Sequence, residues 1–328
     1  MHNSSLIPLP SSLFPLPSSL ITHHSSLITH HSQFALKTFI IRTITGILFV
    51  AIMLTCFLRP LTMVIIFSFI TGATIWEFTR LVNNREDVSI NRFICTASGV
   101  FLFIAIAGYC WGIVSASVFI PYLLTIVYLF ISELYTGSKD PIHDWAYSMM
   151  SQMYIALPLA CINVLAFRTV ITTGDVVYNM LLPLSIFIFL WMNDTGAYLT
   201  GSLIGRHKLF PRISPGKTWE GSIGGGVLVL IVAVLIALID HSHWLVNIGL
   251  ASTDTALSTP EWLGLGLTVV FFGTWGDLVE SLFKRTLGIK DSGNVLPGHG
   301  GMLDRFDSSL MALPAAVIYV YTITLAGI

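Results

Sequence analysis

Long apolar stretches without charged residues dominate this chain and leave few folds open to it. The hydrocarbon core of a bilayer is about 30 Å thick, and a helix needs about 20 mostly apolar residues to cross it. Nine stretches between charged residues or Pro/Gly breaks meet this requirement. The sequence therefore predicts an all-α protein, a polytopic transmembrane helical bundle with about nine spans. The expected spans are residues 38–57, 61–78, 93–113, 117–134, 149–167, 180–200, 221–239, 262–282 and 308–327.

The composition supports an integral membrane protein and excludes several other classes. Hydrophobic residues make up 54% of the 328 residues and charged residues only 10%, and the formal net charge is -1. A soluble monomer of this size could not cover so much apolar area with so few charged side chains. A nucleic-acid partner is not expected because the charge balance is not basic. The 4 cysteines are too few for a disulfide scaffold.

The N-terminal segment differs from the rest of the chain because it consists of a seven-residue repeat. The unit begins with Ser-Ser-Leu and recurs between residues 4 and 32, and prolines in its first two copies argue against a coiled coil. It also lacks the basic start and continuous apolar core of a signal peptide. We expect residues 1–33 to be a disordered low-complexity segment or to precede the true start of the protein. Residues 34–328 are expected to form a single transmembrane domain.

The basic residues predict how the bundle is oriented. Arg59 and Arg168 fall on one side of the membrane, and all other Lys and Arg residues fall on the opposite side. The positive-inside rule places the more basic side in the cytoplasm. The N-terminus is then expected inside and the C-terminus outside. The connections that follow the second, fourth, sixth and eighth spans are expected to be cytoplasmic.

Polar residues gather at the connection between the eighth and ninth spans, residues 276–307. Asp277 lies within an apolar span, where an acidic residue usually faces a partner or a water-filled cavity. Glu280 fits better as a helix-end charge that reaches the membrane interface. Asp304 and Asp307 are three residues apart and share a helix face. Carboxylates hold Mg²⁺, and Mg²⁺ together with Lys or Arg neutralises phosphate oxygens. The segment therefore predicts phosphate chemistry, since it also contains the basic run Lys284, Arg285 and Lys290.

A second polar connection, residues 193–226, follows the sixth span and begins near Asp194. Its Ser-Pro-Gly-Lys-Thr sequence is not a P-loop, because position 211 is Pro where that motif requires Gly and no strand precedes it. Two interpretations stay open for this basic segment: a phosphate site, or a loop against an anionic leaflet. The glycines at the start of the seventh span permit close helix packing. They are Gly221, Gly224, Gly225 and Gly226, and the basic residues are Arg206, Lys208, Arg212 and Lys217.

These two segments also resemble a known family. The resemblance is to the signature of the phosphatidate cytidylyltransferases, or CDP-diacylglycerol synthases. The matching pattern is Ser281-x-x-Lys284-Arg285, then Lys290-Asp291-x-Gly293, then Leu296-Pro297-x-His299-Gly300-Gly301-x-x-Asp304-Arg305-x-Asp307. The segments Asp194–Tyr198 and Ser214–Gly221 resemble a second stretch of the same family. The likeness runs from about residue 38 to the end of the chain and does not include the repeat.

The resemblance implies an enzyme of phospholipid biosynthesis, a nucleotidyltransferase whose catalytic domain is residues 34–328. Its expected reaction converts CTP and phosphatidate to CDP-diacylglycerol and pyrophosphate, with Mg²⁺ as cofactor. The expected location is the cell (inner) membrane, where phosphatidate lies in the cytoplasmic leaflet and the catalytic loops face the cytoplasm. Whether the protein also requires a monovalent cation, and whether it forms a homodimer, stay open.

The resemblance and the chemistry together give expected residue roles. Asp277 and Asp304 are expected to be the main Mg²⁺ ligands, and His299 to donate to a phosphate or to the leaving group. The expected catalytic residues are Asp277, Asp304, Lys284 and His299. The expected substrate-binding residues are Ser214, Lys217, Ser281, Arg285, Lys290, Asp291, Arg305 and Asp307. Asp194 and Glu77, also at cytoplasmic helix ends, are either site residues or helix-packing partners.

Two other classes remain as alternatives. A CTP-dependent kinase of polyprenol or phytol type would share a nucleotide site, but it would transfer the γ-phosphoryl group and release CDP. A transporter or ion channel is compatible with many spans and intramembrane acids. The transporter interpretation is weaker because the polar residues cluster on one side of the membrane and no inverted repeat is visible.

Overall fold

The computed structural model describes residues 43–170, 173–242, 257–293 and 300–326, and it is almost entirely helical in these ranges. The expected all-α class is confirmed. The helices are Thr43–Cys56, α2 (Pro60–Val82), α3 (Arg92–Cys110), α4 (Ile120–Thr136), α5 (Pro141–Met150), α6 (Leu157–Ala166), α7 (Leu181–Ile204), α8 (Trp219–His241), α10 (Thr259–Thr286) and α11 (Leu303–Ala326). A 3₁₀ turn, η1 (Ala116–Phe119), precedes α4, and a π-helical turn, η2 (Ser151–Ala156), joins α5 to α6. Two antiparallel hairpins pair β1 (Phe167–Thr169) with β2 (Val176–Tyr178), and β3 (Lys208–Phe210) with β4 (Ser214–Thr218).

Among the described residues, 7 helices are long and apolar enough to cross a membrane. They are α2, α3, η1 with α4, α5 with η2 and α6, α8, α10 and α11. The expectation of a multi-pass helical membrane protein is therefore confirmed. The other two expected spans are helical as well: residues 38–57 contain the shorter helix Thr43–Cys56, and residues 180–200 lie within α7. The total of nine spans stays a prediction.

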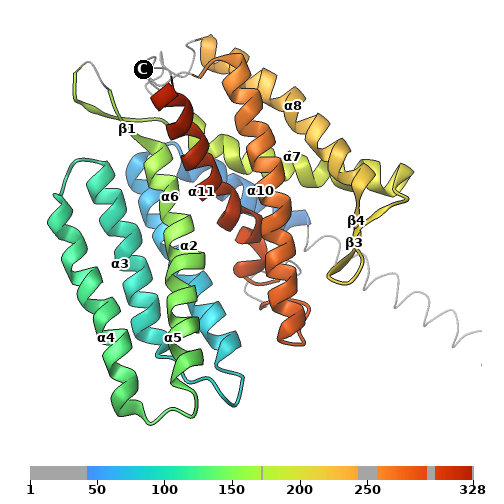
Figure 1. Cartoon of the computed structure of the whole chain (residues 1–328). Coiled ribbons are helices and arrows are strands. Elements are labelled where there is room, and N and C mark those ends of the chain that lie inside the picture. Colours follow the sequence, from blue (N-terminus) through green and yellow to red (C-terminus); the bar gives the residue numbers. More distant parts are fainter. Residues whose placement is uncertain (1–42, 171–172, 243–256, 294–299, 327–328) are drawn as a thin grey trace, which may run out of the picture.

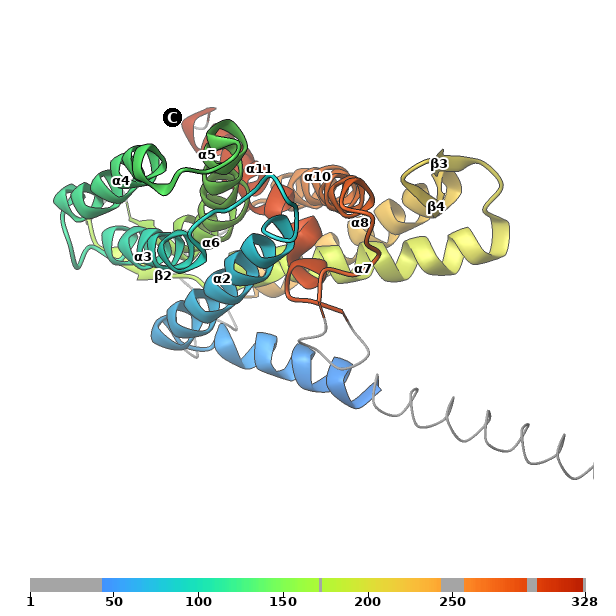
Figure 2. The same cartoon turned by 90° about the horizontal axis from the view of Figure 1, so that it is seen from below.

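The helices form a bundle that is crossed by two others. Figure 1 shows α3, α4, α6 and α10 running in similar directions. Figure 2 shows α3, α4 and α10 nearly end-on, whereas α7 and the helix Thr43–Cys56 are seen from the side. The two predicted spans that are not among the seven candidates therefore run across the bundle.

One end of the bundle carries the connections that the charge pattern assigns to one side of the membrane. The α2–α3 connection, the α4–α5 connection and the C-terminal end of α10 all lie at this end, which is the lower end in Figure 1. The β1–β2 hairpin lies at the opposite end. We call the lower end the site end, because the polar residues singled out in the sequence at the α10–α11 connection lie there.

Small residues bring α7 and α8 into close contact, as the sequence predicted. A Cβ atom at Gly225 would lie 2.6 Å from the carbonyl oxygen of Asn193, so a larger residue could not fit without moving α7. The β3–β4 hairpin between the two helices is fastened to the start of α8. The Glu220 carboxylate accepts hydrogen bonds from the backbone N–H of Arg206 at 3.1 Å and of His207 at 3.2 Å. The hairpin is thus held beside the two helices.

A group of buried aromatic rings fixes the rotation of α11. The Phe306 ring contacts Phe67 of α2 and Phe187 of α7, with ring centroids 6.2 Å apart in both pairs. Phe306 is buried, and it lies between two aspartates in the sequence. Because successive residues on a helix point in different directions, the packing of Phe306 decides where Asp304 and Asp307 point.

Candidate active site

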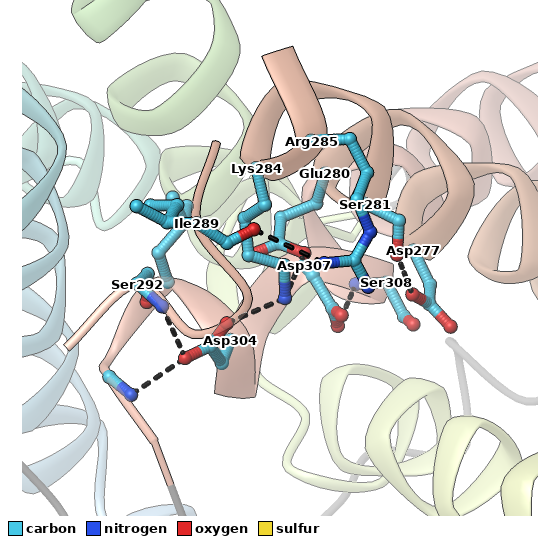
Figure 3. A network of polar contacts seen from close by, with 12 residues as sticks. Asp277, Glu280, Ser281, Lys284, Arg285, Ile289, Ser292, Asp304, Asp307 and Ser308 are labelled. Carbon is cyan, nitrogen blue, oxygen red and sulfur yellow. Dashed lines mark hydrogen bonds and ion pairs between the residues drawn. The ribbon is translucent and has the colours of Figure 1, made fainter. Parts of the chain in front are cut away.

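The C-terminal part of α10 presents polar side chains to α11. Asp277, Glu280 and Lys284 are spaced three and four residues apart, which places them on one face of the helix. Figure 3 shows this face meeting the start of α11. The two helices approach closely because Gly276 has no side chain: a Cβ atom there would lie 2.8 Å from the carbonyl oxygen of Asp307.

Three carboxylates meet at this contact, and we call Asp277, Glu280 and Asp307 the acidic cluster. One carboxylate oxygen from each lies within 4.8 Å of the others. The Ser281 hydroxyl donates a hydrogen bond of 3.2 Å to Asp277 Oδ1. Glu280 has an exposed fraction of 0%, so the expectation that it reaches out to the membrane interface is wrong. Its side chain turns into the contact between α10 and α11 because a lysine one turn later lies beside its carboxylate.

Two lysines lie against these carboxylates. Lys284 Nζ is 2.6 Å from Glu280 Oε2 and 2.7 Å from Asp304 Oδ1. Lys217, from strand β4, forms an ion pair with Asp277. Asp307 adds a fourth carboxylate beside these three. The four carboxylates carry four formal negative charges, and the two lysines carry two positive charges. Charges removed from water are costly unless they are compensated, so the site is suited to a further cation.

Asp304 has a different environment from the acidic cluster, although it is only one turn from Asp307. Its Oδ2 atom accepts backbone N–H bonds from Ser292 at 2.9 Å and from Gly301 at 2.8 Å, and its Oδ1 atom accepts from Lys284. Both oxygens therefore have partners within the protein. The side chain ties the two sides of the α10–α11 connection to each other.

Glu77, on α2, holds the same connection from the other side. Its carboxylate accepts backbone N–H bonds from Met302 at 2.9 Å and from Leu303 at 3.1 Å, and a hydrogen bond from the Ser292 hydroxyl. The N-terminal N–H groups of a helix lack partners within the helix, and an acidic group there also interacts favourably with the helix dipole. Glu77 thus caps the start of α11 from a helix more than 200 residues earlier. We call Glu77 and Asp304 the loop anchor.

Glu77 is buried, with an exposed fraction of 6%. The sequence left its role open between site residue and helix-packing partner, and the structure places it in the support of the site. A signal was present, since an acidic residue within an apolar span usually has a specific partner. The identity of that partner was not readable, because it depends on how α2 packs against a distant loop.

A cavity of about 200 Å³ lies beside the acidic cluster. Its lining includes Lys217 from β4, Asp194 and Tyr198 from α7, Ser222 from α8 and Thr274 from α10. Lys217 therefore faces both the cavity and Asp277. The structure also places Asp194 in the wall of this cavity, which the sequence left undecided.

The structure brings together many, but not all, of the residues expected to form the site. Those that meet around α10 and the start of α11 are Asp277, Ser281, Lys284, Asp304, Asp307 and Lys217. Others lie at the edge with exposed side chains: Arg285, Lys290, Asp291 and Arg305. Arg285 donates a hydrogen bond of 3.2 Å to the carbonyl oxygen of Ile289. Ser214 is half-buried at the start of β4, three residues before Lys217, and His299 lies outside the described residues.

The donor atoms of the acidic cluster fit a hard divalent cation. Its ligand atoms are all carboxylate oxygens, which Mg²⁺ prefers. The sequence expected Asp277 and Asp304 as a pair, but the structure brings Asp277 together with Asp307 and Glu280. Asp304 is not in this group within the described part of the chain, because its oxygens are bound by Lys284 and by two backbone N–H groups.

Comparisons with known proteins show which family this chain resembles. Residues 40–323 match the family model described as the cytidylyltransferase family. A phosphatidate cytidylyltransferase of Staphylococcus haemolyticus is 33% identical over 278 residues, which is 84% of this chain and 96% of that protein. The phosphatidate cytidylyltransferase of Staphylococcus saprophyticus is 50% identical over 131 residues, 39% of this chain and 44% of that protein. That of Staphylococcus aureus strain COL is 48% identical over 130 residues, again 39% of this chain and 44% of that protein.

Proposed function

The chain belongs to the cytidylyltransferase family, and from this premise we propose that it is a phosphatidate cytidylyltransferase. It converts CTP and phosphatidate to CDP-diacylglycerol and pyrophosphate in phospholipid biosynthesis. The catalytic domain is residues 34–328, which contain the whole family match. The N-terminal repeat of residues 1–33 lies outside that match.

The ion pair between Lys217 and Asp277 is the observation that carries this proposal. Lys217 comes from the β3–β4 hairpin and Asp277 from α10, so the two polar segments of the sequence meet at one point. On one side of this contact is the cavity beside α7 and α8, and on the other is the acidic cluster. A reaction between two phosphate compounds needs this combination of cationic groups and metal-binding carboxylates.

The chemistry asks little covalent work of the protein. A phosphate oxygen of phosphatidate forms a bond to the α-phosphorus of CTP, and the bond from that phosphorus to the oxygen of the leaving pyrophosphate breaks. A phosphate monoester is mostly ionised near pH 7, since its second pKa is about 6. No protein group is therefore needed as a base. The protein accelerates the reaction by aligning the two phosphates and by neutralising their charge.

The residues divide these tasks by position. Lys217 faces the cavity, so we assign it to the triphosphate of CTP, and Lys284 neutralises charge at the centre of the site. Asp277, Glu280 and Asp307 would hold Mg²⁺. When bound, the ion would neutralise and orient phosphate oxygens. The loop anchor keeps the first turn of α11 in place, and with it Asp307.

We place the site end of the bundle on the cytoplasmic side of the cell membrane. The positive-inside rule supports this orientation, because the connections at that end are rich in Lys and Arg. The arrangement suits the two substrates: CTP is soluble in the cytoplasm, and phosphatidate lies in the adjoining leaflet. The clustering of the acidic and basic groups of the site at one end also favours an enzyme at the membrane surface over a transporter.

An assay with CTP labelled at the α-phosphate tests the proposal. Detergent-solubilised protein is incubated with phosphatidate and Mg²⁺, and label is followed into the lipid fraction. We expect labelled lipid and an equal amount of pyrophosphate, and no product when EDTA is added. Transfer of γ-label to an added polyprenol, with CDP released and no α-label in lipid, would establish the kinase alternative. Folded protein that gives neither product would overturn the enzyme proposal.

A further inference from the structure

We propose that a groove between α6, α10 and α11 holds one acyl chain of the lipid substrate. The inference rests on the proposed function and adds to it a lipid-binding subsite. The groove has a volume of about 520 Å³. Its wall is mainly apolar and includes Met153, Pro158, Phe272, Met311, Ile318 and Thr322.

The groove continues one face of α11 from the acidic cluster into the bundle. Asp307, Met311 and Ile318 are separated by four and seven residues, so their side chains lie along one side of the helix. Asp307 belongs to the acidic cluster, whereas Met311 and Ile318 line the groove. A lipid whose phosphate lies at the acidic cluster would therefore have its acyl chain directed along this face.

The groove is longer than the depth of one leaflet. Its lining on α11 extends from Leu310 to Thr322. At 1.5 Å per residue this segment is roughly 18 Å long. One leaflet contributes about half of the 30 Å hydrocarbon core, or about 15 Å. The far end of the groove lies 15 residues, or roughly 22 Å, beyond Asp307, so only a long acyl chain attached to a phosphate at the acidic cluster would reach it.

Three hydroxyl groups of the groove wall are hydrogen-bonded within the protein, so they do not interrupt its apolar surface. The hydroxyls of Thr268, Tyr319 and Thr322 donate to backbone carbonyl oxygens, at 2.8, 3.0 and 2.7 Å. These bonds satisfy the hydroxyl hydrogens within the protein. Exposed apolar side chains form the outer edge, since Met153 and Ile318 have exposed fractions of 65% and 68%. A chain could therefore enter sideways from the bilayer.

Tyr154 lies where the groove meets the acidic cluster. It lines the groove together with Leu310 and Met311, which follow Asp307 by one turn on α11. This hydroxyl is buried and has no hydrogen-bond partner in the described part of the chain. A buried polar group without a partner is rare and costly. A lipid bound at this junction would bring glycerol ester oxygens, which are hydrogen-bond acceptors, next to it.

Chain-length selectivity tests the proposal. Phosphatidates with two oleoyl or two octanoyl chains are compared at equal surface concentration in mixed micelles, and the ratio of their kcat/KM values is measured. Thr322→Trp fills the far end of the groove, beyond the reach of an octanoyl chain. We expect the oleoyl-to-octanoyl ratio to fall roughly tenfold, which corresponds to losing about two buried methylene groups. Ile318→Trp, one turn nearer the acidic cluster, should lower the ratio further.

Tyr321→Trp is the matched control, because Tyr321 is exposed, adjacent to Thr322 and outside the groove lining. It should leave the ratio within about twofold of the wild type. Equal ratios in the Thr322→Trp and Tyr321→Trp proteins would overturn the proposal and indicate that bulk lipid fills the groove. Loss of a dimer together with equal losses on both lipids would also overturn it, and would make a second copy the occupant. Wild-type protein inactive on both lipids would instead overturn the proposed function itself.

Discussion

The acidic cluster and the loop anchor use the same kind of side chain in opposite ways. Glu77 and Asp304 of the loop anchor accept hydrogen bonds from the protein backbone, so their charge is already compensated. In the acidic cluster, three carboxylates face one another, and two lysines compensate only part of the charge around them. Asp304 and Asp307 lie within one turn of α11, yet Asp304 supports the site and we assign Asp307 to cation binding. The comparison teaches that the direction in which a carboxylate points within one helical turn decides its role.

The largest effect is expected when a ligand is removed from the acidic cluster. Asp277→Ala should lower kcat/KM for cytidylyl transfer by at least about 10³-fold, because charge stabilisation at the reacting phosphates is lost. Its thermal unfolding temperature should stay close to that of the wild type, since repulsion within the cluster is also reduced. Glu86→Ala, an exposed acidic residue in the α2–α3 connection, is the control and should retain full activity. Wild-type activity in Asp277→Ala would remove the metal assignment.

A smaller effect on activity, joined by a loss of stability, is expected at the loop anchor. Glu77→Ala leaves two backbone N–H groups at the start of α11 without their acceptor, which should lower the free energy of unfolding by about 1–3 kcal/mol. We expect kcat to fall about 10²-fold because the supporting group no longer fixes Asp307.

The dependence on Mg²⁺ distinguishes this positioning role from metal binding. In Glu77→Ala the half-saturating Mg²⁺ concentration should remain near the wild-type value, and Glu77→Gln, which keeps one acceptor oxygen, should recover part of kcat. Recovery of the wild-type kcat by Glu77→Ala at high Mg²⁺ would contradict the positioning role. It would show that the loop anchor contributes to Mg²⁺ binding, as the acidic cluster does.

The smallest of the three mutational effects is expected at Lys217, which contacts the acidic cluster from β4. Lys217→Met should raise KM for CTP about tenfold, because one charge-assisted contact with a phosphate is lost. The same change should lower the half-saturating Mg²⁺ concentration a few-fold, because a positive charge beside Asp277 is removed. Steady-state titrations of CTP and Mg²⁺ measure both constants. A rise in both would show that Lys217 helps to form the cation site instead of competing with the ion.

The sequence predicts much of the fold and one half of the site. Long apolar runs predict the helices, and the acidic and basic residues gathered in residues 276–307 predict a polar site there. Glycines such as Gly225 predict a close helix contact at the start of α8, and the structure identifies α7 as its partner. These features depend on local spacing and composition, which a single sequence contains.

The remaining features depend on packing between distant elements. Asp304 and Asp307 are equivalent in sequence terms, and the burial of Phe306 and the close approach at Gly276 decide which of them faces Asp277. The hydrogen bond between Glu77 and Ser292 joins residues 215 positions apart. Neither contact follows from the periodicity of one helix.

Direct measurement of cation binding tests the difference between the two regions. Mn²⁺, a spectroscopic substitute for Mg²⁺, is titrated into detergent-solubilised protein without substrates and followed by electron paramagnetic resonance. We predict that Asp307→Asn weakens Mn²⁺ binding by at least about tenfold, whereas Asp304→Asn leaves the dissociation constant within about threefold of the wild type. Thermal unfolding of both variants verifies that they are folded. Strong loss of Mn²⁺ binding in Asp304→Asn, with wild-type binding in Asp307→Asn, would contradict the account.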